Sequence, residues 1–155
     1  MIIFGAEVLK IFYARVDFPQ FLSHIIGTSA LDPLLLIFII LLIFIVLGFI
    51  LDSMSIILIF VPFILPPILN LDLNMDQETM KIWFGILMLI IVELGLITPP
   101  VGLNINTIAK IDLSISNNIK NQKSIYRGVL PFFFIEFIRI IIILFFPSII
   151  FIAYF

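Results

Sequence analysis

The chain has 155 residues, of which 63% are hydrophobic and 12% charged, and its mean hydropathy is +1.36. A soluble domain could not bury that many apolar side chains, so the composition predicts an all-α integral membrane protein. The net charge of −2 is too small to favour nucleic acid as a partner. With no cysteine and one histidine, the sequence excludes disulfides and thiolate metal sites and offers no constellation for catalysis, which predicts that the protein is not an enzyme.

Residues 1–33 begin with an apolar stretch, 1–14, that contains Glu7 and Lys10. This stretch is shorter than the roughly 20 residues that a helix needs to cross a bilayer. We expect it to be the far end of a connecting helix. Residues 15–33 mix charged and apolar side chains at a spacing that suits a short interfacial helix.

Residues 34–69 consist of two apolar stretches separated by a polar segment, 52–55. One interpretation is a pair of spanning helices joined by a loop at the far surface. The other is a re-entrant helical hairpin whose tip, 52–55, stops inside the membrane, where non-helical backbone is tolerated if protein or a cavity surrounds it. The tip has no lysine or arginine and the second stretch contains three prolines, but the residues alone leave both interpretations open.

The segment 82–109 is predicted to be a helix that breaks at its Thr-Pro-Pro sequence. The two prolines lack the amide N–H that would bond four residues back, so the carbonyls of Gly95 and Leu96 become free. Thr98 precedes a proline and is pushed from helical toward extended geometry. Free carbonyls, a hydroxyl and the side chain of Asn104 suit a dehydrated small cation, so the break predicts an ion or substrate site in a transporter.

The remaining segments indicate the orientation. The loop 70–81 is acidic, and Trp83 follows it where an interfacial aromatic residue belongs. Residues 110–127 hold four of the eight basic residues and are expected to form a cytoplasmic loop. The final transmembrane helix is predicted at 129–155, with its end on the outer side.

Asp52 is the sharpest candidate for a functional side chain, because a carboxylate inside a membrane segment is costly unless it is paired or hydrated. The alternative is a helix cap, in which Asp52 or a serine beside it, Ser53 or Ser55, satisfies the first amides of the next helix. The two roles are compatible, since a helix N-terminus aimed into a cavity also attracts an anion.

Thr98, Gly102 and Asn104 belong to the break itself. For these residues the alternative to a ligand role is a proline kink that packs against neighbouring helices. The residue types alone favour an ion or substrate role, because a kink does not need two prolines between a threonine and a glycine.

Two charged features accompany these candidates. Glu93 lies one turn before the break and is either a proton or cation site or a carboxylate hydrogen-bonded to a neighbouring helix. Glu136 and Arg139 are three residues apart, and we interpret them as an ion pair within the last helix rather than as part of a pathway.

Three stretches, in order along nearly the whole chain, carry a resemblance to a known family. They are Leu-Gly-Phe-Ile-Leu-Asp (47–52) with Ile-Ile-Leu-Ile-Phe-Val-Pro (56–62) and Leu-Pro (65–66), Trp-Phe-Gly-Ile (83–86) with Glu-Leu-Gly-Leu-Ile-Thr-Pro-Pro-Val-Gly-Leu-Asn (93–104), and Ile-Tyr-Arg-Gly-Val-Leu-Pro-Phe (125–132). Together they resemble the C-terminal part, or second inverted repeat, of the DctM-like large permease subunit of tripartite ATP-independent periplasmic (TRAP) transporters.

This resemblance implies a multi-pass, elevator-type secondary transporter in the bacterial inner membrane, built from two inverted repeats that each hold a re-entrant hairpin and a broken helix. It would take up organic acids such as C4-dicarboxylates, driven by sodium and delivered by a periplasmic binding protein, together with a small membrane subunit. No cofactor besides the coupling sodium ion is implied. On this sequence the hairpin would be 34–69, the broken helix 82–109, the cytoplasmic loop 110–127 and the last helix 129–155.

The resemblance also implies a sodium and substrate site where the hairpin tip faces the broken helix. Its residues would be Asp52, Ser53, Ser55, Gly95, Thr98, Gly102 and Asn104. Family members are several hundred residues long, and this chain resembles the second repeat alone, so we expect transport only together with the missing first half. The alternatives are a non-transporting remnant or membrane assembly partner, and another sodium-coupled carboxylate carrier with a similar hairpin.

Overall fold

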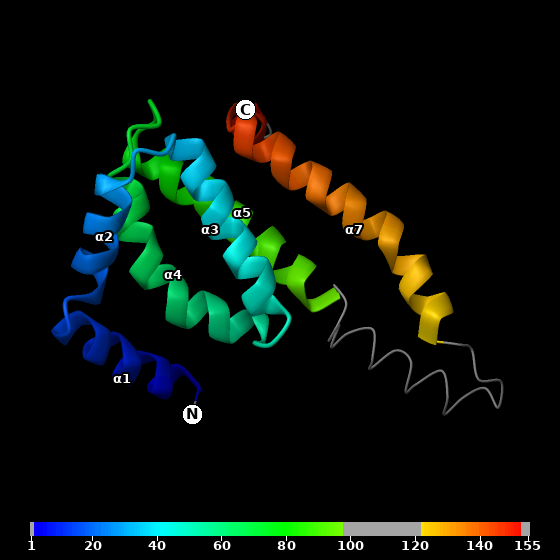
Figure 1. The fold of residues 1–155 in the computed structure, drawn as a ribbon, viewed down its shortest axis with the longest axis horizontal. Helices are drawn as coiled ribbons and strands as arrows, with labels where there is room; N and C mark the ends of the chain where they lie inside the picture. The colour runs from blue at the N-terminus through cyan, green and yellow to red at the C-terminus, as the bar shows by residue number, and fades with distance from the viewer. Residues whose placement is uncertain (1, 98–121, 153–155) are drawn as a thin grey trace.

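The computed structural model describes residues 2–97 and 122–152, and every regular element in this part of the chain is a helix (Figure 1). The helices are α1 (Ile2–Arg15), α2 (Phe18–Thr28), α3 (Pro33–Gly48), α4 (Ser53–Leu69), α5 (Gln77–Ile97), α7 (Gln122–Phe145) and α8 (Ser148–Ile152). The prediction of an all-α protein is confirmed for these residues.

Aspartate side chains explain where two of the helices begin. Oδ1 of Asp32 accepts a hydrogen bond from the amide of Leu34 at 2.9 Å, which satisfies one of the free amides at the start of α3. Asp76 accepts hydrogen bonds from the hydroxyl and the amide of Thr79, and these bonds lower the pKa of Asp76. This cap lets α5 begin at Gln77, earlier than the start near residue 82 that the apolar pattern predicts.

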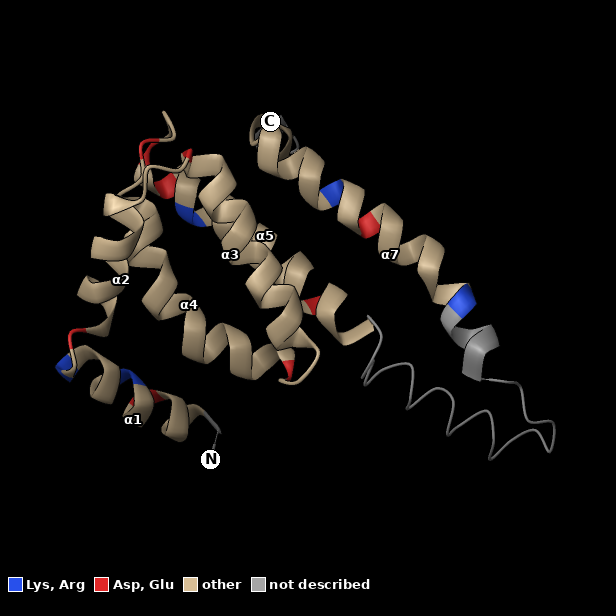
Figure 2. Ribbon diagram, viewed as in Figure 1, with Lys and Arg blue, Asp and Glu red and all other residues tan. Residues whose placement is uncertain are grey.

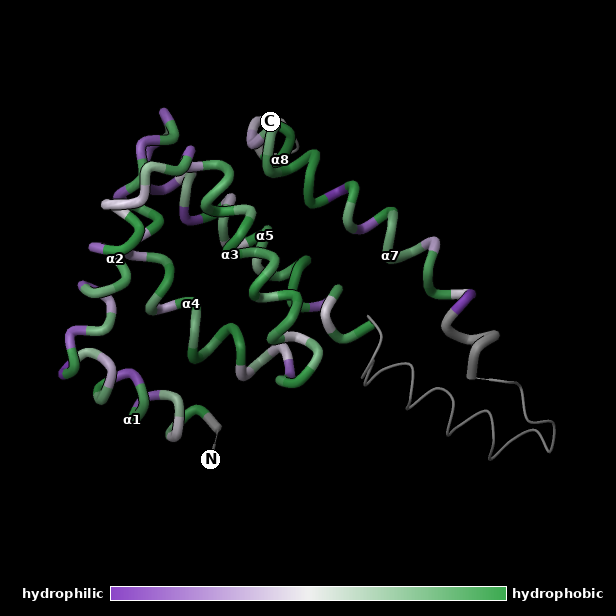
Figure 3. Tube along the Cα trace, viewed as in Figure 1, coloured by the Kyte–Doolittle hydropathy of each residue, from purple (hydrophilic) through white to green (hydrophobic). Residues whose placement is uncertain are grey.

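Helices α5 and α7 are long and apolar enough to cross a membrane, α7 over its segment Arg127–Phe145. Helices α3 and α4 are also strongly apolar (Figure 3), but with 16 and 17 residues they reach about 24 and 26 Å at 1.5 Å per residue. That is less than the roughly 30 Å hydrocarbon core. Helix α7 begins at Gln122, so the last part of the predicted loop 110–127 is helical.

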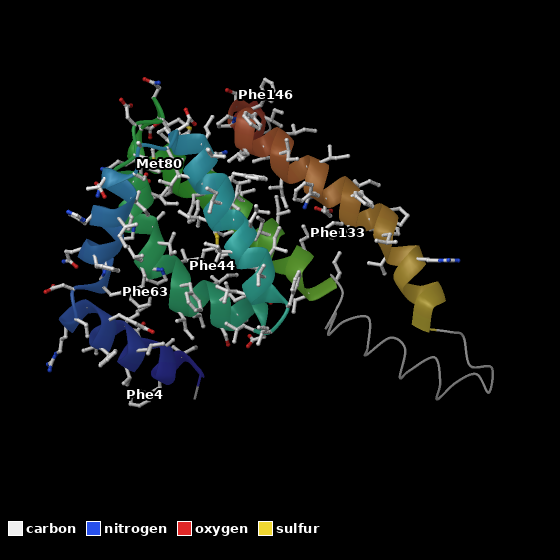
Figure 4. All side chains as sticks on the ribbon, viewed as in Figure 1. Phe4, Phe44, Phe63, Met80, Phe133 and Phe146 are labelled. Carbon is white, nitrogen blue, oxygen red and sulfur yellow. The ribbon has the colours of Figure 1, made fainter. Side chains whose placement is uncertain are left out.

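The core lies where α3, α4 and α5 meet, and α5 occupies the middle because it contacts α3, α4 and α7. Phe44 of α3 and Met80 of α5 lie in this core (Figure 4). Along α5, the side chains of Trp83, Phe84 and Leu87 have no exposed surface. Apolar side chains are buried along most of α5. This explains why α5 forms one central helix although its sequence has no amphipathic periodicity.

Helices α1 and α2 form an outer pair that packs against α4 (Figure 1). The two helices are joined at Asp17, whose φ of 52° is a left-handed conformation that aspartate tolerates better than most residues. The rings of Tyr13 and Phe18 lie 4.9 and 6.3 Å from the ring of Phe63 on α4. These edge contacts hold the outer pair in place.

Helices α3 and α5 cross at a pair of glycines. A Cβ atom added to Gly95 would lie 2.7 Å from the Cα of Gly48, and one added to Gly48 would lie 2.9 Å from the Cα of Gly95. Both distances are shorter than van der Waals contact allows, so a larger residue at either position would force the helices apart. Small residues are the usual means by which membrane helices bring their backbones together. The contact joins the last residue of α3 to the C-terminal part of α5.

Trp83 is completely buried, which corrects the expectation that it lies among lipid head groups as an interfacial aromatic residue. Its Nε1–H donates a hydrogen bond of 2.8 Å to the backbone carbonyl of Ile143 in α7. In a continuing helix that carbonyl would accept from the amide four residues later, but Pro147 has no N–H to give. The indole supplies the missing donor and ties α7 to α5.

Replacing Trp83 by phenylalanine should keep most of the buried aromatic packing. It should leave the carbonyl of Ile143 without a hydrogen-bond donor. We expect Trp83→Phe to destabilise the protein by about 1–3 kcal/mol, the cost of an unsatisfied buried polar group. Hydrogen exchange of the last amides of α7, measured in detergent micelles, should accelerate. Phe84→Leu, which removes packing without a hydrogen bond, serves as the control, and equal acceleration in both variants would contradict this role.

The close contact between Gly48 and Gly95 leads to a second prediction, on stability. Gly95→Ala should lower the free energy of unfolding by about 1–3 kcal/mol, because the new Cβ overlaps the backbone of Gly48. Gly85→Ala is the matched control on the same helix, since nothing lies within 4 Å of a Cβ added there. That control should be neutral or stabilising by up to about 1 kcal/mol from helix propensity. Denaturant titrations of both variants give the comparison, and a stable Gly95→Ala protein would refute the close crossing.

Candidate ion and substrate site

The glycine crossing brings the α3–α4 connection, residues 49–52, next to the C-terminal part of α5 (Figure 1). Lys81 marks the polar beginning of α5, and Gly95 lies about 21 Å further along the helix at 1.5 Å per residue. A helix that runs along the bilayer normal would therefore carry the crossing well into a hydrocarbon core of about 30 Å.

Asp52 caps α4 at this connection. Its Oδ2 accepts a hydrogen bond from the amide of Ser55 at 3.0 Å, and its Oδ1 accepts one from the hydroxyl of Ser55 at 2.5 Å. The predicted cap is therefore present, and it fixes the carboxylate over the first turn of the helix. Both hydrogen bonds are local, so they need no contribution from another helix.

The same side chains remain open to a ligand. Asp52 is exposed, and Ser53 and Ser55 are partly exposed. Each carboxylate oxygen keeps a second lone pair, and oxygen atoms of carboxylates, hydroxyls and carbonyls are the ligands that hard cations prefer. The first amides of α4 also present the positive end of a helix dipole, which favours an anion. The ligand role of Asp52, Ser53 and Ser55 stays a prediction.

Of the other four predicted site residues, the structure describes one, Gly95. Gly95 lies inside α5 and is buried against Gly48, so it takes part in the crossing. Thr98, Gly102 and Asn104 lie outside the described residues, and their ligand role stays a prediction. Within the described residues, no group of three or more histidine, cysteine, aspartate and glutamate side chains could hold a metal ion.

No role is predicted for Gly48 from the residue pattern, although it directly follows a long run of large apolar residues in α3. A glycine in such a stretch weakens the helix and points to a packing reason, which was the available signal. The interpretation of Glu136 and Arg139 as an ion pair within one helix is confirmed, with 2.6 Å between Oε2 and Nη2. Glu93 lines the same cavity as this pair, which the spacing could not show because the two helices are far apart in sequence.

Comparison with known proteins identifies the family. The model of the tripartite ATP-independent periplasmic transporter, DctM component, matches residues 1–149. A Haemophilus influenzae protein named as a TRAP transporter large permease is 34% identical over 77% of this chain and 27% of its own length. No solved structure matches the chain significantly.

Two further relatives carry substrate names. The sialic acid TRAP transporter large permease SiaM of Vibrio cholerae is 26% identical over 96% of this chain and 32% of its own length. The C4-dicarboxylate TRAP transporter large permease DctM of the same species is 28% identical over 94% of this chain and 30% of its own length. This chain thus spans about a third of the length of these relatives. The match of the family model over nearly all of it shows that the chain belongs to the membrane-embedded DctM component of the tripartite ATP-independent periplasmic transporters.

Proposed function

We propose that this chain acts as the second inverted repeat of a TRAP large permease, a part of a sodium-coupled transporter that takes up organic acids. The observation that carries this proposal is the glycine crossing, which sets the tip that follows α3 beside the part of α5 that leads into Thr98. A hairpin tip and a helix break that face each other at membrane depth are the elements from which transporters build ion and substrate sites.

In this proposal the hairpin 34–69 is re-entrant. The lengths of α3 and α4 support it, because about 24 and 26 Å fall short of the hydrocarbon core. The side chains of these two helices carry no charge between their ends (Figure 2), as a hairpin surrounded by protein and lipid requires.

The proposed site combines two kinds of group. Asp52, Ser53 and Ser55 would supply carboxylate and hydroxyl oxygens from the tip. Gly95, Thr98, Gly102 and Asn104 would supply carbonyl, hydroxyl and amide oxygens from the broken helix 82–109. A sodium ion held between them would bring positive charge to the N-terminus of α4, so that sodium and a carboxylate substrate each favour binding of the other.

The names of the relatives support organic acids as the substrate class. They mention C4-dicarboxylate and sialic acid, and both carry carboxylate groups. A tripartite system would provide a periplasmic binding protein and a small membrane subunit as partners, in the inner membrane of a bacterium. The first repeat would come from the rest of a longer permease or from a separate chain.

The test is sodium-driven uptake of C4-dicarboxylate or sialic acid into proteoliposomes that contain this chain, the first repeat, the small subunit and the binding protein. Asp52→Ala and Thr98→Ala should each reduce uptake to background, because each removes a proposed oxygen ligand. Asp72→Ala and Thr28→Ala, which change exposed residues of the same types outside the proposed site, serve as matched controls.

Uptake that survives both site substitutions would refute the site. No uptake in any combination of subunits would instead favour a remnant or an assembly partner. Uptake that needs sodium but no binding protein would refute the tripartite assembly in this proposal.

A further inference from the structure

A cavity of about 270 Å³ lies between α5 and α7. Among the described residues, its charged lining consists of Glu93 from α5 and of Glu136 and Arg139 from α7, and the other described lining residues are apolar. Glu93 is exposed while Gly95 is buried against α3, so the cavity opens on a different side of α5 from the glycine crossing.

The charges in this cavity do not balance. Arg139 is held by Glu136, with 2.6 Å between Nη2 and Oε2. The other ion pairs of the described residues join Glu7 to Lys10 and Glu78 to Lys81, so Glu93 takes part in none of them. The formal charges of these three described side chains sum to −1, and the excess negative charge is that of Glu93.

The position of Glu93 makes this imbalance costly. Glu93 lies 12 residues after Lys81 on a helix long and apolar enough to span, or about 18 Å deeper along its axis. Charged side chains at such depth in a membrane are paired with another charge or face a water-filled cavity. Because the described residues give Glu93 no ion-pair partner, a basic side chain from outside them would remove this cost.

The surroundings of the cavity fit a membrane helix. Leu89, one turn before Glu93 on α5, is 54% exposed, and Ile138 and Ile142 on α7 are 54% and 43% exposed. These apolar side chains continue along both helices beside the charged cavity. The chain spans about a third of the length of its relatives, so a permease of their length has further segments outside the matched region.

We propose that the α5–α7 cavity is the docking site for a transmembrane helix of the remaining part of the permease, and that this helix pairs a lysine or arginine with Glu93. The inference relies on the membrane placement in the proposed function but not on the sodium site. A single basic side chain would neutralise the cavity and leave the Glu136–Arg139 pair intact.

The test uses this chain in lipid vesicles with synthetic leucine-rich transmembrane peptides that carry one lysine or one glutamine at their centre. The chain has no cysteine, so Ser148→Cys places a single fluorophore at an exposed position for energy transfer to a labelled peptide. We expect stronger association with the lysine peptide, loss of that preference in Glu93→Gln, and its recovery in Glu93→Asp.

Glu78→Gln is the matched control on α5, because Glu78 is exposed near the start of the helix and pairs with Lys81. The control and Asp52→Asn should both keep the lysine preference, so failure of the docking site and failure of the sodium site give separate results. Arg139→Gln should strengthen the preference, since the cavity then carries a charge of −2. Equal association of both peptides, or a preference that survives Glu93→Gln, would overturn the proposal.

Discussion

The backbone contact between Gly48 and Gly95 is the constraint on which the rest of the structure depends. It lets α3 and α5 approach more closely than any side chain larger than hydrogen would allow, and it does so at the end of α3. The short connection to α4 then has to lie against α5, and Asp52 has to begin α4 there. A second tie, from the indole of Trp83 to the carbonyl of Ile143, holds α7 on another part of α5.

Much of the helical architecture could be predicted from composition and breaks in the apolar stretches. The polar residues at 52–55 mark a helix start because the side chain of Asp52 satisfies a free amide. The start of α5 is predicted too late, near residue 82, because the apolar pattern does not reveal the cap that Asp76 provides. Long-range contacts could not be predicted in this way. Trp83 has the position of an interfacial residue in the sequence, but it is buried in the core and its indole donates to the carbonyl of Ile143 in α7.

In the candidate site, too, local features could be predicted from the sequence and long-range contacts could not. Asp52 and Ser55 could be identified locally, since their hydrogen bonds lie within one helical turn. That the tip lies beside Gly95 depends on which faces of α3 and α5 pack together, and an all-apolar helix such as α3 has no periodic face from which to read this. Membership of the DctM family agrees with a membrane transport role, and the glycine crossing places the tip beside the C-terminal part of α5.

The most direct measurement is a cysteine cross-link between the tip and the predicted break. The chain has no native cysteine, so Ser53→Cys with Asn104→Cys forms a unique pair in lipid vesicles. If the two segments face each other, mild oxidation or a short thiol-reactive linker should join them, and sodium should change the rate. Ser53→Cys with Ser148→Cys should remain unlinked. Absence of a cross-link in the first pair, with both cysteines reactive to small thiol reagents, would contradict the account.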